Sequence, residues 1–385
     1  MKILIIHNAY GKFSGEEAVV DAHCRILTNA GHDVELFTRS SEELFSMRFG
    51  KLVGFVSAFI NPVAISKLKD VLKAFKPDVV HIHNLYPLIS PAILPVIQRA
   101  GIPIVMTVHN YRLICPNGLF YNQKGICEAC AGGKEWRCVV NNCENSIPKS
   151  LGYALRNMIA RLFQLYNKYV DIYFCLTHFQ REKLVENGFD AKRCIVLPNF
   201  MHSNSINSLC SSDEKKGVLF IGRLNRSKGI DVLLRTAELC QEVPVFLAGV
   251  PDRSVVDIEH LPQNVEWLGI VSGQSKLDAF QRVVALVFTS RCYEGLPMVF
   301  LEAMQNSLPI IAPKLAGIPE IIREGYNGWL FEPNNPEDLA SVIRYVLGHP
   351  EQAQEYGENG KKLLQREYSG KAWLEGYINA LESIK

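Results

Sequence analysis

The stretch after the apolar run Val283 to Phe288 contains residue types that suit the binding of an anion. The run predicts a buried strand, and Pro297 is expected to be the first residue of the next helix, where its missing N–H costs nothing. The N–H groups of Met298 and Val299 would then be free at the positive end of the helix dipole. A phosphate group is a natural ligand for such an arrangement.

Two carboxylates, Glu294 and Glu302, lie on either side of these N–H groups. A carboxylate does not attract an anion, but it accepts hydrogen bonds from the hydroxyl groups of a ribose or a hexose. Phosphate and hydroxyl groups in one ligand indicate a nucleotide, or a nucleotide joined to a sugar. The alternative is that both residues are solvated surface charges on an ordinary strand–helix crossover.

Cationic side chains for a diphosphate occur in the segment that begins at Val218. An apolar strand is followed there by Gly222, a polar turn with Arg223 and Lys228, and a helical pattern. Both cations are suited to a diphosphate. The sequence has no Asp-x-Asp pair of the kind that often holds Mg²⁺ on such a ligand. Two cations and a helix N-terminus could neutralise the charge instead, so catalysis is predicted not to require a metal cofactor.

Histidines end two of the predicted strands. His109 closes the strand Pro103 to His109, and open α/β sheets bind their ligands at the carboxyl ends of strands. It has either a site role or a structural one. His81 and His83 lie at the end of another strand, and we interpret them as pointing to opposite faces, so that they could not jointly chelate an ion from that strand.

A cysteine-rich loop, residues 115–145, is the main candidate for a metal site. Four of its thiols fall within 17 residues and open with a Cys-x-x-Cys pair, which fits a small tetrahedral structural zinc site: Cys127, Cys130, Cys138 and Cys143. Free thiols or a redox pair remain open alternatives. Five other cysteines have apolar neighbours and are predicted to be small core residues: Cys115, Cys175, Cys194, Cys240 and Cys292.

The elements that position these residues form two α/β domains. At 385 residues the chain is long for one core. Strand and helix patterns alternate twice and are separated by a polar linker at residues 201–216, which predicts two doubly wound domains with a cleft between them. We assign residues 1–200 and 201–370 to these domains, and expect residues 371–385 to form a helix that crosses back to the first. Predicted strands are Lys2–His7, Asp33–Thr38, Asp78–His83, Pro103–His109, Ile172–Thr177, Pro244–Ala248, Val265–Leu268, Val284–Thr289 and Pro309–Ala312, together with the strand that begins at Val218 and precedes Gly222.

The charge of the chain is uneven. Residues 1–200 contain 23 basic and 16 acidic side chains, net +7, and the remainder contains 18 and 23, net −5. The first half is therefore expected to face an anionic partner. The segment Phe45 to Phe75 is apolar and basic, as is the predicted helix Ile147 to Tyr169, and both suit an anionic membrane surface. The alternative is a pair of core-packing helices with a solvated face.

The sequence predicts a cytoplasmic protein, because a strand begins at Lys2 and no signal peptide is visible. The uncharged run Leu52 to Ser66 is too short to span a bilayer and contains Pro62.

Several motifs together resemble the family 4 retaining glycosyltransferases of the GT-B fold, and the resemblance covers nearly the whole chain. They are Gly222-Arg-Leu-x4-Lys228-Gly, Glu294-Gly-Leu-Pro-x4-Glu302-Ala, Gly317-Ile-Pro-Glu-Ile-Ile, Gly325-x-Asn-Gly-x-Leu, Ser14-Gly-Glu-Glu17, Gly31-His-Asp-Val34 and Val108-His-Asn110. The family usually has Gly-Gly where this chain has Ser14-Gly15. The cysteine cluster resembles that of a subset of these enzymes, mostly from bacterial surface-polysaccharide pathways.

The resemblance implies transfer of a sugar from a UDP- or GDP-sugar, with retained anomeric configuration, to a growing glycan of surface polysaccharide or lipopolysaccharide. Such acceptors are often lipid-linked, which implies peripheral contact with the inner face of the cytoplasmic membrane. Arg223 and Lys228 would stabilise the diphosphate leaving group, Glu302 would bind the ribose, and Glu294 and His109 would contact the donor sugar. Backbone groups near the donor would come from Gly15, Gly222, Gly295, Leu296, Met298 and Val299.

Three alternatives remain at this point. One is another GT-B activity, such as a nucleotide-sugar 2-epimerase. A second is a non-catalytic protein with a zinc loop on a nucleotide-binding scaffold. A zinc-knuckle nucleic-acid module is disfavoured, because the loop between Cys127 and Cys143 holds only Lys134 and Arg137 as basic residues. No nucleic-acid partner is therefore expected.

Overall fold

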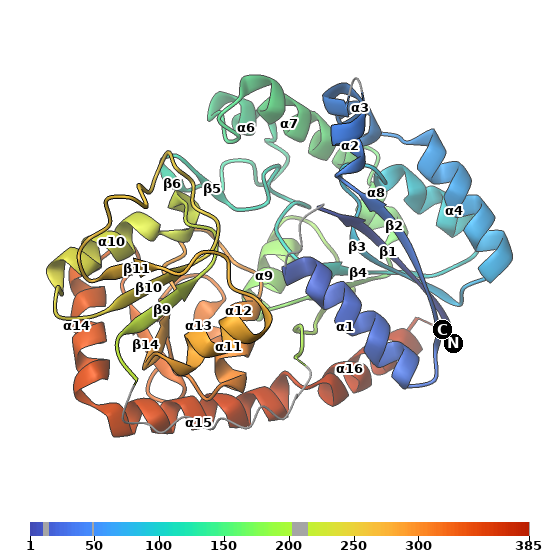
Figure 1. The fold of residues 1–385 in the computed structure, drawn as a ribbon. Coiled ribbons are helices and arrows are strands. Elements are labelled where there is room, and N and C mark those ends of the chain that lie inside the picture. The colour runs from blue at the N-terminus through green and yellow to red at the C-terminus, as the bar shows by residue number, and fades with distance from the viewer. Residues whose placement is uncertain (11–14, 48–49, 202–214, 385) are drawn as a thin grey trace. The chain divides into compact units, whose positions relative to one another are not determined.

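The computed structural model describes residues 1–10, 15–47, 50–201 and 215–384. The chain divides into two compact units, of which unit 1 is Met1–Asn199 with Gly370–Lys385 and unit 2 is Phe200–Ser369. Each unit is built on a six-stranded, wholly parallel sheet (Figure 1). The linker predicted at residues 201–216 lies almost entirely outside the described residues.

The sheet of unit 1 has the strand order β2-β1-β3-β4-β7-β8. Its strands are β1 (Lys2–Ala9), β2 (Asp33–Ser40), β3 (Val79–Asn84), β4 (Ile104–Val108), β7 (Ile172–Cys175) and β8 (Cys194–Val196). The first five confirm the predicted strands. Sequence analysis missed β8.

Helices connect these strands, as parallel pairing requires. They are α1 (Gly15–Asn29), α2 (Glu43–Ser46), α3 (Gly50–Ser57), α4 (Pro62–Phe75), η1 (Pro91–Ile93), α5 (Leu94–Arg99), α6 (Trp136–Val140), α7 (Ile147–Leu162), α8 (Leu165–Tyr169) and α9 (His178–Glu186). Unit 1 also includes α16 (Gly370–Glu382), the last helix of the chain. A two-stranded hairpin, β5 (Tyr121–Asn122) and β6 (Gly125–Ile126), precedes α6. The C-terminal helix α16 lies beside α1 (Figure 1), and its Trp373 ring packs 4.0 Å from the His23 ring.

The sheet of unit 2 has the order β11-β10-β9-β12-β13-β14. The elements are β9 (Val218–Ile221), η3 (Arg226–Lys228), α10 (Ile230–Leu239), β10 (Val245–Ala248), β11 (Val265–Trp267), α11 (Gly273–Gln281), β12 (Ala285–Val287), α12 (Met298–Gln305), β13 (Ile310–Pro313), α13 (Ile318–Ile321), β14 (Gly328–Phe331), α14 (Pro336–Gly348) and α15 (Pro350–Glu367). Successive connections leave in opposite directions from β9 and β12. In such sheets a crevice for ligands opens at this reversal, outside the carboxyl ends of the strands.

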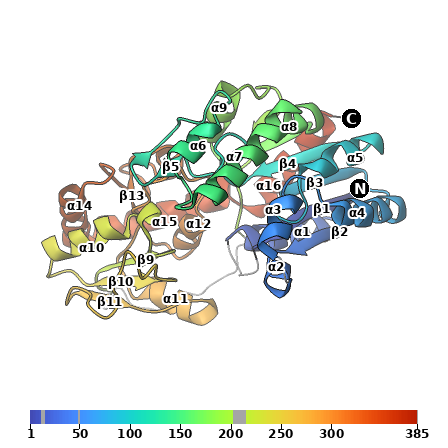
Figure 2. The ribbon, with the colours of Figure 1, turned by 90° about the horizontal axis from the view of Figure 1, so that it is seen from above.

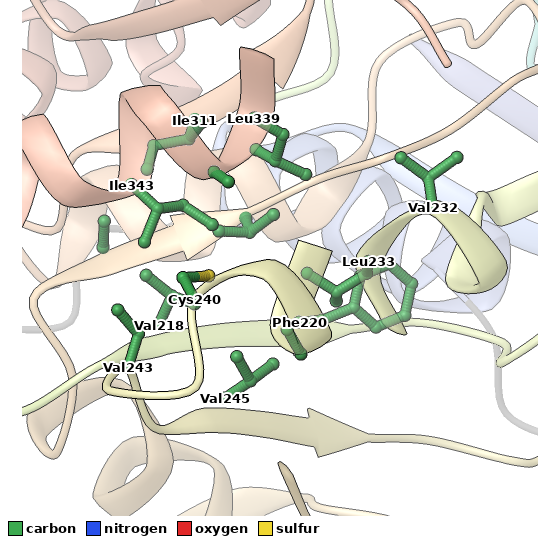
Figure 3. Packing of buried hydrophobic residues seen from close by; sticks show 14 of the residues in the cluster. Val218, Phe220, Val232, Leu233, Cys240, Val243, Val245, Ile311, Leu339 and Ile343 are labelled. Carbon is green, nitrogen blue, oxygen red and sulfur yellow. The ribbon is translucent and has the colours of Figure 1, made fainter. Parts of the chain in front are cut away.

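The hydrophobic core of unit 2 includes residues of both β9 and β12. Leu233 of α10 and Ile343 of α14 pack over strand residues such as Phe220 and Val245 (Figure 3). All four side chains are at most 1% exposed. Strands buried on both faces explain the nearly continuous apolar runs in the sequence.

Gly229 links η3 to α10 and provides a test of this packing. Its φ of +68° is left-handed, and a Cβ built there would lie 1.9 Å from the carbonyl oxygen of Thr289. We expect Gly229→Ala to lower the free energy of unfolding by about 2–4 kcal/mol, because the strain and the clash add. Urea denaturation measures this loss. In the control Gly348→Ala the new Cβ meets nothing within 4 Å, so a change below about 1 kcal/mol is expected. Equal losses in the two variants would contradict the packing argument.

Candidate functional site

The loops that follow β9 and β12 are joined by a buried ion pair. Lys228 Nζ lies 2.5 Å from Glu294 Oε1, and both side chains are less than one fifth exposed. Ser290 Oγ donates a second hydrogen bond to the same carboxylate oxygen, at 2.5 Å. The Thr289 hydroxyl donates to the carbonyl oxygen of Lys228 at 2.8 Å, so the two loops are also held through the backbone.

This pair is charged because each partner stabilises the other. Burial by itself would raise the pKa of Glu294, but the charge of Lys228 and the hydrogen bonds from Lys228, Ser290 and Cys292 together hold that pKa below its usual value. Burial would likewise lower the pKa of Lys228, and the carboxylate of Glu294 raises it instead. The site therefore presents an ionised carboxylate and an ammonium at the point where the strand order reverses.

Arg223 and Gly222 follow β9 directly. The Arg223 side chain is exposed, and it lies close enough to Lys228 to oppose the protonation of that amine. The amide of Gly222 donates to the carbonyl oxygen of Ala248 at 3.0 Å, which keeps the start of the turn next to the end of β10. Two neighbouring cations at a strand end can hold a diphosphate.

The helix after the second loop begins one residue later than predicted. Pro297 is the N-cap of α12, with ψ of 118°, and Met298 is the first helical residue. The prediction that Pro297 would be the first helical position was therefore wrong, because its ψ is extended rather than helical. The amides of Met298 and Val299 occupy the first turn, where α-helical amides have no intrahelical acceptor. Leu296 is buried just before the helix, and Gly295 is partly buried.

Glu302 lies inside α12 and has a partner that sequence analysis missed. Lys276 of α11 places its Nζ 2.6 Å from Glu302 Oε1, and about a quarter of each side chain is exposed (27% and 21%). No spacing signal connects residues 276 and 302, so only the fold brings them together. The pairing leaves part of the carboxylate accessible to hydroxyl groups of a ligand.

Two glycines border the same edge of the sheet at β10 and β11. The amide of Gly249 donates to the carbonyl oxygen of Gly269 at 2.7 Å. The indole of Trp267 donates to the carbonyl oxygen of Gly249 at 3.1 Å. These contacts place backbone groups of both glycines beside the point where the strand order reverses.

In unit 1, His109 directly follows β4 and is hydrogen-bonded to a second histidine. His83 Nδ1 and His109 Nε2 are 2.8 Å apart, and one of the two rings donates to the other. Burial lowers the pKa of His109 to about 3, so its imidazole is neutral near pH 7. A neutral imidazole can donate or accept a hydrogen bond, but it brings no positive charge to a substrate.

The interpretation that His81 and His83 point to opposite faces was wrong. Residues two apart on a strand share a face, and these rings lie 4.4 Å apart. With His23 of α1 they form a buried group whose ligand atoms all lie within 4.8 Å of one another, so the group could hold a metal ion. The rings of His23 and His81 are stacked at 27°, however, and an ion must lie in the plane of each ring it binds. We therefore describe this group as a packed stack of imidazoles.

Gly15 is the exposed first residue of α1, and Ser14 lies outside the described residues. The next residue, Glu16, accepts a hydrogen bond from the Tyr10 hydroxyl at 3.2 Å. Burial raises the pKa of Glu16 to about 7, although the charge of Arg112 opposes this. Sequence analysis missed this cluster, because Tyr10 and Arg112 come from different strand ends.

The four-cysteine loop remains a candidate zinc site. Cys130 and Cys138 are buried against Ala154, with Cys143 packed beside them. A hydrogen bond between the thiols of Cys138 and Cys143 raises the pKa of the first and lowers that of the second. Within the described part of the chain, the thiols do not form a group of three within 4.8 Å, so zinc binding stays a prediction. The five predicted core cysteines are buried, which confirms that prediction.

The apolar and basic segment Phe45 to Phe75 has features of both structures proposed from its sequence, a membrane-binding surface and core-packing helices. Helix α4 packs Leu68 and Leu72 into the core and exposes its lysines, as an ordinary core helix does. The preceding helices instead expose large apolar side chains, with Phe45 88% and Leu52 62% exposed. None of the described helices combines the length and the apolar character needed to cross a bilayer.

Two family models match the chain in succession. Residues 13–204 match "Glycosyltransferase Family 4", and residues 203–363 match "Glycosyl transferases group 1". A protein of Klebsiella pneumoniae described as an uncharacterised 42.6 kDa protein in the cps region is 25% identical over 81% of this chain and 74% of its own length. An uncharacterised glycosyltransferase of Methanocaldococcus jannaschii is 29% identical over 56% of this chain. That match spans 60% of the relative's length.

Solved structures share the whole fold at low identity. HepE of Anabaena in complex with UDP aligns over 100% of both chains, with a TM-score of 0.68 and 18% identity. The sucrose-phosphate synthase of Thermosynechococcus elongatus aligns over 100% of both chains, with a TM-score of 0.74 and 16% identity. These neighbours confirm the predicted α/β fold class, the GT-B architecture of two Rossmann-like domains.

The ion pair of Lys228 and Glu294 makes a testable prediction about stability. Lys228→Met leaves a buried carboxylate without its cation, so we expect a loss of about 3–5 kcal/mol at pH 7. In the wild type the lowered pKa of Glu294 contributes stability above the unfolded-state pKa, and that stability disappears as the pH falls through the folded-state pKa. In the variant, burial raises this pKa, so the loss should shrink as the pH falls towards 5.

Chemical denaturation of both proteins at several pH values measures this effect. The double variant Lys228→Met/Glu294→Gln is the matched control, because it removes both charges and should be less destabilised than Lys228→Met. A Lys228→Met loss that does not change with pH would contradict the assignment.

Proposed function

We propose that this chain, which belongs to the GT-B glycosyltransferases, moves a sugar from a nucleotide diphosphate sugar to a glycan acceptor with retention of configuration. The observation that carries the proposal is the Lys228–Glu294 pair at the strand-order reversal of unit 2. It places a cation for a diphosphate next to a carboxylate for a sugar, and the first turn of α12 adds free amides.

In this proposal the diphosphate is bound and stabilised as leaving group by Arg223 and Lys228. Negative charge on the diphosphate grows as the bond to the sugar breaks, and fixed cations in a partly dry site stabilise that charge. Glu294 holds Lys228 in place and accepts hydrogen bonds from donor-sugar hydroxyls. The two cations take the part that a metal ion plays in other nucleotide-sugar sites, so the proposed catalysis uses no metal.

The nucleoside end is assigned to Glu302 and its partner. Glu302 accepts hydrogen bonds from the ribose hydroxyls, while the contact with Lys276 at 2.6 Å orients the carboxylate. The amides that follow Glu294 bind phosphate and sugar oxygens: Gly295, Leu296, Met298 and Val299. HepE of Anabaena has been solved with UDP and with UDP-glucose, which supports a nucleotide diphosphate sugar as donor.

Unit 1 is assigned to the acceptor and to one donor contact. His109, neutral because of its burial, hydrogen-bonds to the donor sugar, and Gly15 lies near the donor phosphate. The acceptor is a lipid-linked glycan of surface polysaccharide, reached at the cytoplasmic membrane face. The net charge of +7 in residues 1–200 and the exposed apolar helices α2 and α3 support this, as does the cps-region relative of Klebsiella pneumoniae.

The donor assignment is tested first by nucleotide binding. Thermal unfolding is measured with UDP, GDP and ADP, because a ligand of the native state at 100 times its Kd adds about 2.7 kcal/mol of stability. We expect one nucleotide to raise Tm in the wild type and the rise to vanish in Glu302→Ala. Glu355→Ala, an exposed carboxylate on α15, is the matched control and should keep the rise. No shift with any nucleotide would overturn the donor site.

A transfer assay with the identified donor then separates binding from chemistry. Glu294→Ala and His109→Ala are expected to lower turnover more than nucleotide affinity, and detection of a retained-configuration product would separate transfer from epimerisation. Unchanged rates in both variants would contradict the proposed roles.

The hydrogen bond from His83 gives a separate prediction. His83→Ala removes the contact that orients His109, so kcat should fall about 5–10-fold for one lost bond, with KM for the donor little changed. His83→Gln, which retains hydrogen-bonding groups, should recover part of the rate. A fall in kcat/KM with unchanged kcat, or no recovery in the glutamine variant, would show that His83 acts only through packing.

A further inference from the structure

Unit 1 contains a cavity of about 690 Å³ that none of the assigned donor-site residues line. Its lining includes residues that come soon after four neighbouring strands: Tyr10 after β1, Ser41 after β2, Tyr86 after β3 and Arg112 after β4. These positions all lie at the carboxyl edge of the sheet, where parallel α/β sheets bind ligands. The volume falls within the range of about 300–1,000 Å³ typical of small-molecule sites.

The cavity adjoins the pocket that contains His109. Tyr86 and Arg112 line both spaces, and the smaller space is also lined by His83 and His109. A molecule in the large cavity would therefore have one end beside the histidine that we assign to the donor sugar. This inference rests on the proposed function, which makes such a molecule the acceptor.

The charged residues that line the cavity favour an anionic ligand. Arg112, Lys149 and Arg156 line the cavity, whereas none of the lining residues within the described chain is a carboxylate. Arg112 is largely buried; its Nε has no hydrogen-bond partner, while its Nη1 donates to the Tyr10 hydroxyl at 3.1 Å. The Lys149 side chain is half exposed and paired with Glu144 at 2.6 Å, so it can turn towards a ligand. A buried guanidinium with an unused donor favours a phosphate.

The other walls of the cavity are apolar and favour a hydrocarbon chain. Leu44, Phe55 and Ala58 line the cavity on the side of α2 and α3, and α3 lies beside α7 in both views (Figures 1 and 2). Gly152 of α7 allows this approach, because a Cβ there would lie 2.7 Å from the Phe55 ring. Outside the cavity these three helices expose large apolar side chains: Phe45, Leu52, Val56, Ile147 and Leu151. Large apolar side chains exposed on neighbouring helices are typical of contact with a lipid or a partner.

We propose that this cavity binds the phosphate group and the adjoining hydrocarbon chain of a long-chain lipid phosphate or diphosphate, the carrier on which the acceptor sugar is attached. The phosphate lies among Arg112, Lys149 and Arg156, and the chain passes Phe55 towards these exposed apolar side chains. The attached sugar extends towards His109. The same apolar side chains bring the protein to the membrane that contains the lipid.

The experiment is calorimetric binding with three soluble probes, namely farnesyl diphosphate, farnesol and inorganic pyrophosphate. We expect farnesyl diphosphate to bind at least 10-fold more tightly than either of the others, because only it has both parts. Pyrophosphate binding as tightly as farnesyl diphosphate would overturn the lipid assignment. No binding of farnesyl diphosphate would overturn the whole proposal.

Variants decide where the probe binds. Ala58→Trp fills the cavity and Lys149→Glu reverses a lining charge, and each should weaken farnesyl diphosphate at least 10-fold. The matched controls on α4, Ser66→Trp and Lys73→Glu, are exposed positions outside the cavity and should bind normally. Normal binding in Ala58→Trp, or equal loss in the controls, would overturn the location.

The donor site is tested separately in the same samples. Arg223→Ala should keep farnesyl diphosphate binding, and Ala58→Trp should keep the Tm rise with the donor nucleotide. If no nucleotide raises the Tm of the wild type, the proposed function is contradicted. If a nucleotide raises it but farnesyl diphosphate does not bind, only the assignment of the acceptor cavity is contradicted.

Discussion

The ion pair of Lys228 and Glu294 holds together the part of unit 2 on which the proposed chemistry depends. Its partners come from loops after two strands, β9 and β12, whose onward connections leave in opposite directions. The gap that such a reversal leaves must be bridged by side chains, and a buried pair persists only if both charges are satisfied. Ser290 adds the further hydrogen bond that the carboxylate needs. A substrate diphosphate would then share Lys228 with a carboxylate that already fixes its position.

Unit 1 differs from unit 2, because uncharged imidazoles and aromatic rings line the edge of its sheet. Burial lowers the pKa of His81 and His109 to about 3, so the stack can be packed without unpaired charge. Trp373 and Tyr377 of α16 cover this stack, which ties the last helix of the chain to the first sheet. Three cationic side chains, Arg112, Lys149 and Arg156, instead line the cavity that we assign to a lipid phosphate.

Much of the fold was predictable because parallel strands buried on both faces produce apolar runs that are plain in a sequence. Two strands, β8 and β14, were missed. The position of Arg223, Lys228 and Glu294 on turns that follow strands was also predictable, since these turns are bounded by glycines that are plain in the sequence. Lys276 was missed, because its pairing with Glu302 depends on how α11 packs near α12. The error about His81 and His83 came from the direction assigned to alternate residues on a strand.

By itself the sequence determined the order of strands and helices, the polar residues at strand ends and the family to which they belong. These are local properties, since periodicity and turn chemistry depend on residues a few positions apart. Only the tertiary structure decided which residues meet: Lys276 with Glu302, His83 with His109, and Tyr10 with Arg112. It also decided that residues after four strands enclose one cavity. Such contacts join positions far apart in the chain, and the strand order that brings them together is set by packing of the whole sheet.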